Sequence, residues 1–343
     1  MPVRFPRPLS PGDRIGVTAP SSGVDDGMWP RLEVALEALR RRGFEPVVGE
    51  CIHTPSHVSA PREARADELM SMLVDPDIAA VVPPWGGETS IDLLPLLDLE
   101  LLAAVDPCWY VGFSDTTTTM LPLTLRAGWA TLHGWNLMDT PYAAAPGHLH
   151  WADAAALPAG ASFTQRAATL RRRPGWDDYR GHPDVDTMTL DLPARWRGLR
   201  PEDEAASFTG RLVGGCVECL SALVGTPYGD VPAFASEHAT DGTIVCLEVC
   251  EWGPFDVARA LHGMRLAGWF DGATGVLMGR PAGRDAAHWT QVDAVRDAFG
   301  ELPCPVVLDL DFGHSQPFMS LVNGALATVS LDADRQEIRQ TLA

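Results

Sequence analysis

Short apolar runs alternate with helix-like stretches through the first 140 residues, and this alternation constrains the fold more than any other feature of the sequence. Residues 14–19, 45–49, 78–82 and 108–111 are expected to be strands, and amphipathic stretches separate them. Such a pattern predicts an α/β fold with a parallel, flavodoxin- or Rossmann-like sheet. In sheets of this kind, ligands bind at the carboxyl ends of the strands.

The length of 343 residues favours two domains. We expect an N-terminal domain over residues 1–140 and a linker with a lid-like excursion over 141–209, where Ala, Pro, Gly and Arg dominate. A smaller C-terminal α/β domain is expected over 210–343. Its clearest predicted elements are strands at 244–249, 305–310 and 325–331 and a helix at 255–267.

All 26 basic residues are arginines, against 45 acidic residues, which gives a net charge of −19. This charge argues against nucleic-acid polymers and anionic membranes as partners, because both require basic surfaces. The absence of lysine excludes a pyridoxal-phosphate Schiff base, a phosphate-binding P-loop lysine and a Ser–Lys dyad. A small-molecule substrate is the remaining expectation.

The N-terminal stretch lacks the apolar region of a secretory signal, and no run of about 18 apolar residues predicts a membrane span. Seven cysteines, an odd number in a long chain, are typical of a reducing compartment. We therefore expect a cytoplasmic protein.

Ser114 is the candidate nucleophile, because it stands between an apolar strand and the start of a helix. A serine in such a turn exposes its hydroxyl next to backbone amides that can stabilise an oxyanion. Gly112 fits the crowded turn, but Thr116 replaces the last glycine of the G-x-S-x-G pattern. A plain helix-capping serine explains the position equally well.

A serine nucleophile needs a base and a group that orients the base. His314 follows a predicted strand beside a glycine, although one histidine among ten is more often structural. Glu248 lies in the apolar strand at 244–249, where a carboxylate requires a hydrogen-bond or charge partner. Its position alone also fits a solvent-facing strand end.

Eight short motifs occur along the chain. They are APSSG at 19–23, Gly86-Gly87, GFSD at 112–115, HGWNLM at 133–138, GRLVGG at 210–215, LVGTPY at 223–228, Leu247-Glu248 with Glu251, and DFGH at 311–314. Taken together, these motifs resemble, in the same order, those of the serine peptidase family of the LD-carboxypeptidases and the microcin C immunity peptidases. The resemblance covers nearly the whole chain.

The resemblance implies a triad of Ser114 as nucleophile, His314 as general base and Glu248 as the group that orients His314. It also implies an oxyanion hole formed by the backbone amides of Gly87 and Asp115. No metal or cofactor is expected, and the family implies a homodimer.

Two features of the sequence favour the microcin-immunity branch. One is Trp85-Gly86-Gly87-Glu88; the other is the long excursion, in which Trp176 is the candidate for stacking on a nucleotide. Cys216 and Trp135 replace residues that are usual in the family and are expected near the substrate. The expected reaction is hydrolysis of an amide near the C-terminus of a small peptide-like substrate, such as an aminoacyl-nucleotide.

Several alternatives stay open. A muropeptide carboxypeptidase would use the same triad. Cys216-x-x-Cys219 with Cys246 and Cys250 could instead supply four thiolates to zinc in a non-peptidase, although buried cysteines often act as small apolar residues. An α/β-hydrolase esterase would have the same triad order, but the second glycine of its serine motif is missing after Ser114. A dinucleotide-binding enzyme lacks its G-x-G-x-x-G signature after the first strand.

Overall fold

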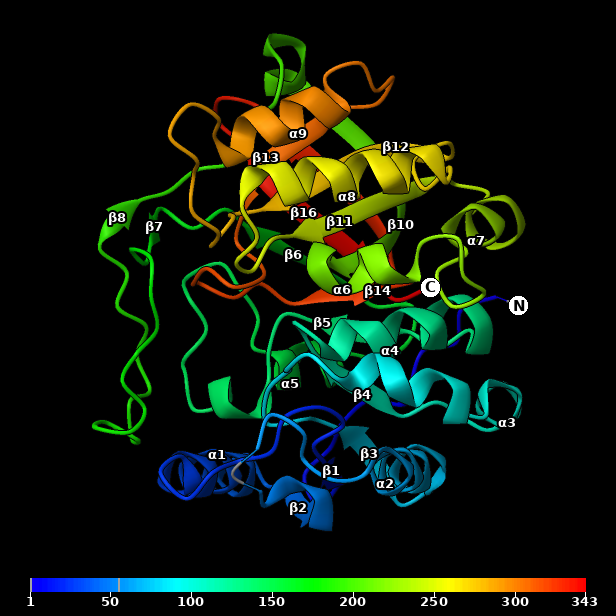
Figure 1. Cartoon of the computed structure of the whole chain (residues 1–343), viewed down its shortest axis with the longest axis vertical. Coiled ribbons are helices and arrows are strands. Elements are labelled where there is room, and N and C mark those ends of the chain that lie inside the picture. The colour runs from blue at the N-terminus through cyan, green and yellow to red at the C-terminus, as the bar shows by residue number, and fades with distance from the viewer. Residues whose placement is uncertain (1, 55) are drawn as a thin grey trace.

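The computed structural model describes residues 2–54 and 56–343, which build two β-sheets with helices packed against them. Figure 1 shows the two sheets as layers stacked along the long axis of the molecule, with the N-terminal half in the lower layer. No helix in the described part of the chain has the length and apolar character needed to cross a membrane.

The lower sheet has six strands in the order β14-β5-β4-β3-β1-β2. Five of them run parallel, as the alternating pattern predicts, and β14 joins the edge antiparallel to β5. The C-terminal half of the chain thus completes the N-terminal sheet. The strands are β1 (Arg14–Val17), β2 (Glu45–Val48), β3 (Ile78–Val81), β4 (Trp109–Gly112), β5 (Thr131–His133) and β14 (Leu321–Asn323).

The helices of this layer follow the predicted spacing, and a side-chain contact connects the second of them to the sheet. Pro61 occupies the cap position of that helix, and the Ser59 hydroxyl donates to the carbonyl of Ala19 at 2.5 Å. Ser59 therefore ties the helix to the end of β1. The helices are α1 (Trp29–Arg41), α2 (Arg62–Val74), α3 (Leu99–Ala104) and α4 (Thr116–Pro122), with 3₁₀ helices at Glu50–Ile52, Ser90–Leu96 and Leu137–Asp139 and a π-helix at Leu123–Ala127.

The upper sheet has eight strands in the order β6-β16-β15-β10-β11-β12-β13-β9. Strands β10 to β13 are parallel, and antiparallel strands flank them on both sides. The strands are β6 (Ser162–Arg166), β9 (Arg197–Gly198), β10 (Ala206–Cys216), β11 (Thr243–Glu248), β12 (Ala273–Gly279), β13 (Val306–Leu310), β15 (Leu326–Leu331) and β16 (Gln336–Thr341).

Helices α8 (Pro254–Leu266) and α9 (Gln291–Phe299) pack side by side on one face of the upper sheet (Figure 1). Their buried faces join an apolar core that also contains α4 and residues of α2. This shared core holds the two layers together. The remaining helices are α5 (Trp151–Ala155), α6 (Val217–Leu220) and α7 (Val231–His238), with 3₁₀ helices at Pro201–Ala205 and Ser221–Leu223.

The excursion over residues 141–209 contains more regular structure than its composition suggests. Its strands β6 and β9 form both edges of the upper sheet, while β7 (Leu170–Arg171) and β8 (Leu192–Pro193) pair as a separate ribbon. This ribbon lies on the left-hand side in Figure 1, beside the upper layer, and the chain between its two strands extends down toward the lower layer. The excursion is therefore anchored in the second sheet through β6 and β9.

Candidate active site

Ser114 occupies a sharp turn between β4 and α4. Its φ angle of +61° lies in the left-handed region, which non-glycine residues seldom adopt. A Cβ atom on Gly112 would lie 2.6 Å from a side-chain carbon of Thr116, so the turn requires glycine at that position. The strained turn directs the partly exposed Ser114 into a cavity, as expected for a nucleophile elbow.

Two backbone amides beside Ser114 are available to a ligand. Neither Gly87 N–H nor Asp115 N–H donates a hydrogen bond to another described residue. The two segments lie in close contact, because a Cβ atom on Gly86 would stand 2.7 Å from the Asp115 nitrogen and 2.8 Å from Ser114 Oγ. Both amides are therefore without a partner in the described structure, and that of Asp115 lies in the turn that carries Ser114.

The side chain of Asp115 is used for support. Its carboxylate accepts hydrogen bonds from the Ser21 hydroxyl at 2.6 Å, the Ser90 amide at 2.8 Å and the Thr118 hydroxyl at 3.0 Å. These contacts fix the start of α4 against the loops that follow β1 and β3. Ser21 belongs to the APSSG motif, so this motif supports the turn that carries Ser114.

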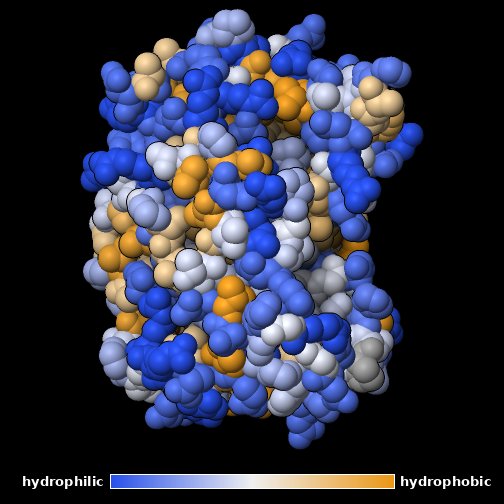
Figure 2. Space-filling model, turned by 90° about the vertical axis from the view of Figure 1, so that its left-hand side faces the viewer, coloured by the Kyte–Doolittle hydropathy of each residue, from blue (hydrophilic) through white to orange (hydrophobic). Residues whose placement is uncertain are grey.

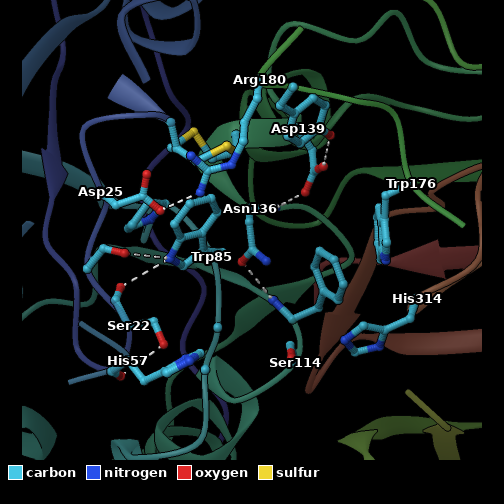
Figure 3. Close-up of a pocket in the computed structure, with 18 of the residues that line it drawn as sticks. Ser22, Asp25, His57, Trp85, Ser114, Asn136, Asp139, Trp176, Arg180 and His314 are labelled. Atoms are coloured by element: carbon cyan, nitrogen blue, oxygen red, sulfur yellow. Dashed lines mark hydrogen bonds and ion pairs between the residues drawn. The ribbon is translucent and has the colours of Figure 1, made fainter. Parts of the chain in front are cut away.

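His314 and Glu248 form a close charged contact beside Ser114. Nδ1 of His314 lies 2.7 Å from Oε2 of Glu248, and the glutamate side chain is fully buried at the end of β11. With Nδ1 engaged, Nε2 of His314 is the ring nitrogen left for proton transfer. Figure 3 shows Ser114 and the His314 ring facing the same cavity.

Burial and charge act in opposite directions on this pair. Burial alone would lower the pKa of His314, but the Glu248 carboxylate, together with the Cys250 side chain, overrides it and raises that pKa well above its ordinary value. Burial likewise opposes ionisation of Glu248, and the positive charge and hydrogen bond of His314 overcome it, so the pKa of Glu248 is lowered. The geometry thus stabilises an imidazolium–carboxylate pair.

His133 is a third buried group at this pair. Its Nε2 atom lies 4.0 Å from Oε1 of Glu248, and burial lowers its pKa to about 4. Neither its ring nitrogens nor Oε1 of Glu248 has a hydrogen-bond partner among the described residues. In the sequence, His133 is only one residue of the HGWNLM motif, because no local pattern links it to Glu248.

The cavity at Ser114 has a volume of about 770 Å³. Its walls come from the segments after β1 to β5, from the excursion and from His314 after β13, so the carboxyl ends of the parallel strands face it as the parallel sheet predicts. Figure 3 shows Asp25 and Arg180 meeting across its upper edge, where their side chains form a 2.7 Å ion pair. This pair joins the excursion to the N-terminal layer.

The structure brings some of the predicted substrate-binding residues to this cavity. Trp85, Gly86 and Gly87 line it, and the Trp85 indole N–H donates to the carbonyls of Ser22 and Gly23. Trp176 also lines it, 47% exposed, with its ring stacked at 6.3 Å on Phe318 and edge-on to His314.

Other predicted residues lie outside the cavity. Trp135 is fully buried and packs on Phe318 and His150. Glu88 is exposed, 3.9 Å from His57, and is absent from the cavity wall. Cys216 is buried, and its thiol lies within 4.8 Å of the ligand atoms of Glu248 and His314. Its side chain therefore lies beside the candidate catalytic pair, outside the cavity wall.

The cysteines do not form the four-thiolate site considered above. Cys246 lies buried in β11, where its thiol contacts the carbonyl of Ile244. Among residues 2–54 and 56–343, the one group of three ligand atoms close enough for a metal is Cys216 with Glu248 and His314, within 4.8 Å of one another. Two of these belong to the candidate catalytic pair, so the four-cysteine zinc site was a wrong alternative for this fold.

A buried arginine positions the excursion at the cavity, and the sequence did not reveal it. Arg31 in α1 donates to the carbonyls of Met138, Pro183 and Val185. Its guanidinium also stacks 4.3 Å from the ring centre of Tyr179, whose hydroxyl donates to Asp139 at 3.1 Å. Burial raises the pKa of Asp139 to about 6.

Glu218 is a second residue without a sequence signal. Its Oε1 accepts hydrogen bonds from the backbone amides of residues 250, 251 and 252, at 2.9 to 3.1 Å. The other oxygen lies 3.2 Å from Sγ of Cys216. Glu218 thereby holds the loop after β11, next to the Glu248–His314 pair.

The chain is similar to known proteins over nearly its whole length. The LD-carboxypeptidase N-terminal domain matches residues 15–134, and the LD-carboxypeptidase C-terminal domain matches residues 209–329. A Streptomyces coelicolor protein provisionally named a carboxypeptidase is 29% identical over 340 residues, covering 96% of this chain and 93% of its own. The microcin C7 self-immunity protein MccF of Escherichia coli is 22% identical, covering 95% and 92%.

Solved structures share the fold at lower identity. MccF in complex with glutamyl sulfamoyl guanosine superposes with a TM-score of 0.81 at 20% identity, over 98% of both chains. An MccF-like protein from Bacillus anthracis superposes with a TM-score of 0.80 at 19% identity, over 99% of both. The two domain matches together cover most of the chain, which therefore belongs to the LD-carboxypeptidase family of peptidases.

Proposed function

We propose that this protein is a serine peptidase that hydrolyses an amide bond near the C-terminus of a small peptide-like substrate, with Ser114, His314 and Glu248 as its catalytic triad. The observation that carries this proposal is the 2.7 Å contact between His314 and buried Glu248, beside a serine at φ +61° in the same cavity. The family's carboxypeptidase names support the reaction class.

Each group has a distinct role in the proposed reaction. Ser114 Oγ attacks the amide carbonyl while Nε2 of His314 accepts its proton, and Glu248 stabilises the imidazolium that forms. The amides of Gly87 and Asp115 donate to the developing oxyanion. His314 then returns the proton to the leaving amine, and a water molecule activated by His314 hydrolyses the acyl-enzyme.

The proposed substrate is an aminoacyl-nucleotide or peptidyl-nucleotide of the microcin type. Trp176 supports this choice, because its exposed ring borders the cavity and can stack on a planar base. Solved MccF structures carry aminoacyl sulfamoyl nucleosides, which is a property of those proteins that this cavity would share.

Hydrolysis of muropeptide tails is the second candidate. A Bacillus subtilis protein provisionally named a murein peptide carboxypeptidase is 22% identical over 331 residues, and it covers 95% of this chain. The same triad would serve this reaction, so the groups that line the cavity, and not the triad, decide between the two substrates.

We further propose a division into residues 1–140, 141–209 and 210–343, and a cytoplasmic homodimer. The seven cysteines, all in the described part of the chain, are free thiols, which suits a reducing compartment. Light scattering during size-exclusion chromatography would test the dimer, with a mass near twice the 37.0 kDa of one chain as the expected result.

Parallel hydrolysis assays would decide the substrate class. Wild-type enzyme would be offered an aspartyl-adenylate amide and an LD-tetrapeptide, with release of aspartate or of the terminal residue as the readout. Preferential hydrolysis of the adenylate amide supports the proposed substrate, and preferential hydrolysis of the tetrapeptide supports a muropeptide substrate. No turnover of either would reject the proposed function.

A further inference from the structure

A second, larger cavity opens on the other side of His314. It measures about 1310 Å³ and lies between the β7–β8 ribbon, the segment after β12 and the start of α9. His314 and Trp176 line both cavities, so the second one is continuous with the candidate active site. Figure 2 faces the side that carries the ribbon, where strongly hydrophilic residues cover much of the surface.

Arginine dominates the lining of this cavity, although the whole chain is strongly acidic. Eight of the 26 arginines line it, against four carboxylates. They come from three separate segments of the chain: Arg171, Arg172, Arg173, Arg195, Arg197, Arg280, Arg284 and Arg296. The fold therefore gathers positive charge at one place, where a partly enclosed wall strengthens its field.

Five of these arginines are held by carboxylates, and three are not. The ion pairs are Arg172–Asp177, Arg173–Asp191, Arg197–Asp309, Arg280–Asp311 and Arg296–Asp293. Arg171, Arg195 and Arg284 have no carboxylate within 4.0 Å in the described part of the chain. Their charges remain available to an anionic ligand.

Buried polar groups in the cavity wall point to the same conclusion. Arg280 is 5% exposed, and neither terminal nitrogen has a hydrogen bond of good geometry within the described structure, although one lies 2.5 Å from Asp311. Gln316 is 1% exposed, and both atoms of its amide lack a partner. An unpartnered buried amide is destabilising, and a polar ligand in the cavity would supply its missing hydrogen bonds.

The cavity at Ser114 has the opposite character. Asp25, Asp139, Asp177 and Asp178 line it, with Arg180 as its single arginine. A substrate that spans both cavities therefore meets acidic and aromatic groups on one side of the candidate nucleophile and guanidinium groups on the other. This asymmetry would fix the direction in which the substrate lies.

We infer that the arginine-rich cavity binds an anionic portion of the substrate that carries two or more carboxylate or phosphate groups. The inference rests on the proposed function, since it assigns this cavity to the substrate of Ser114. Guanidinium groups bind carboxylates and phosphates through the same paired hydrogen bonds. The lining therefore favours a negatively charged ligand but does not distinguish between these two groups.

Binding can be measured without turnover. Ser114→Ala enzyme would be titrated calorimetrically with acetyl-Glu-Glu-Glu, acetyl-Gln-Gln-Gln and inorganic triphosphate. The test variant adds Arg195→Gln and Arg284→Gln, and the control adds Arg41→Gln and Arg126→Gln, two exposed arginines without ion pairs outside both cavities. Both double variants lose the same charge.

The expected result is that an anionic probe binds, that the test variant binds it at least about tenfold more weakly, and that the control changes little. Tighter binding of the glutamate peptide identifies carboxylates, and tighter binding of triphosphate identifies phosphates. Equal loss in both double variants, equal binding of the glutamine peptide, or no binding would overturn the inference. Binding without turnover of either assay substrate would reject the proposed function alone.

Discussion

Gly313 lies so close to Glu248 that a Cβ atom at position 313 would stand 2.6 Å from the carboxylate oxygen Oε2. The φ angle of Gly313 is also +90°, a conformation that L-residues rarely adopt. The residue before His314 must therefore be glycine for the histidine to reach the buried carboxylate. Gly279 in β12 is similarly close, because a Cβ atom at position 279 would stand 2.9 Å from Glu248 Cβ.

Gly313→Ala is accordingly expected to lower kcat by about a hundredfold or more, since a displacement of catalytic groups by about 1 Å can cost that much. Gly263→Ala is the matched control, because its Cβ would meet no atom within 4 Å in α8. Steady-state kinetics and circular dichroism on both variants provide the check. A folded Gly313→Ala enzyme with wild-type kcat would contradict the role of this contact.

Gly86→Ala tests the proposed oxyanion hole. The new methyl group would lie 2.7 Å from the Asp115 nitrogen and would displace the oxyanion from the amides. We expect kcat to fall by roughly 10²–10³-fold, the usual effect of losing one oxyanion donor, with a smaller change in KM. An effect confined to KM would show that Gly86 contacts the substrate and that the amides do not serve the transition state.

The pH dependence of kcat/KM should report the Glu248–His314 pair. The general base must be neutral, and Glu248 raises the pKa of His314, so activity is expected to rise with pH through a midpoint above the ordinary histidine pKa of about 6.5. Glu248→Gln removes the negative charge, so the midpoint should move to lower pH while the maximal rate falls on the order of 10⁴-fold. A midpoint that stays in place would assign the titration to another group.

Trp176→Ala tests the proposed contact with a nucleotide base. Base–aromatic stacking contributes about 1–3 kcal/mol, so KM for the adenylate substrate should rise with little change in kcat. Hydrolysis of the LD-tetrapeptide should be unaffected. Phe255→Ala is the control, because Phe255 is also exposed, at 56%, but lies outside both cavities. An equal change in KM for both substrates would show that Trp176 does not stack on a nucleotide base.

Local sequence patterns were sufficient for the parallel sheet and for the turn at Ser114. Strand and helix periodicity are properties of neighbouring residues, and a serine between β4 and α4 can be found from them alone. The contact between residues 248 and 314 was expected only through the family resemblance, since periodicity says nothing about pairs 66 residues apart.

Features that depend on distant partners were not predictable from pattern. The excursion looked like a linker, yet β6 and β9 join the upper sheet because β16 and β13 offer them free edges. Arg31 reads as a solvent-facing residue of α1, but three carbonyls, two of them from the excursion, hold it in the interior. Trp135 was expected near the substrate and instead fills the core behind Phe318.

Comparison of wild-type and Ser114→Ala enzyme, on whichever assay substrate the wild type hydrolyses, tests the central claim most directly. The account predicts that kcat falls by on the order of 10⁴-fold or more, while calorimetry shows that the variant still binds the substrate. Hydrolysis by Ser114→Ala at a rate within about tenfold of wild type would contradict the assignment of Ser114 as the nucleophile.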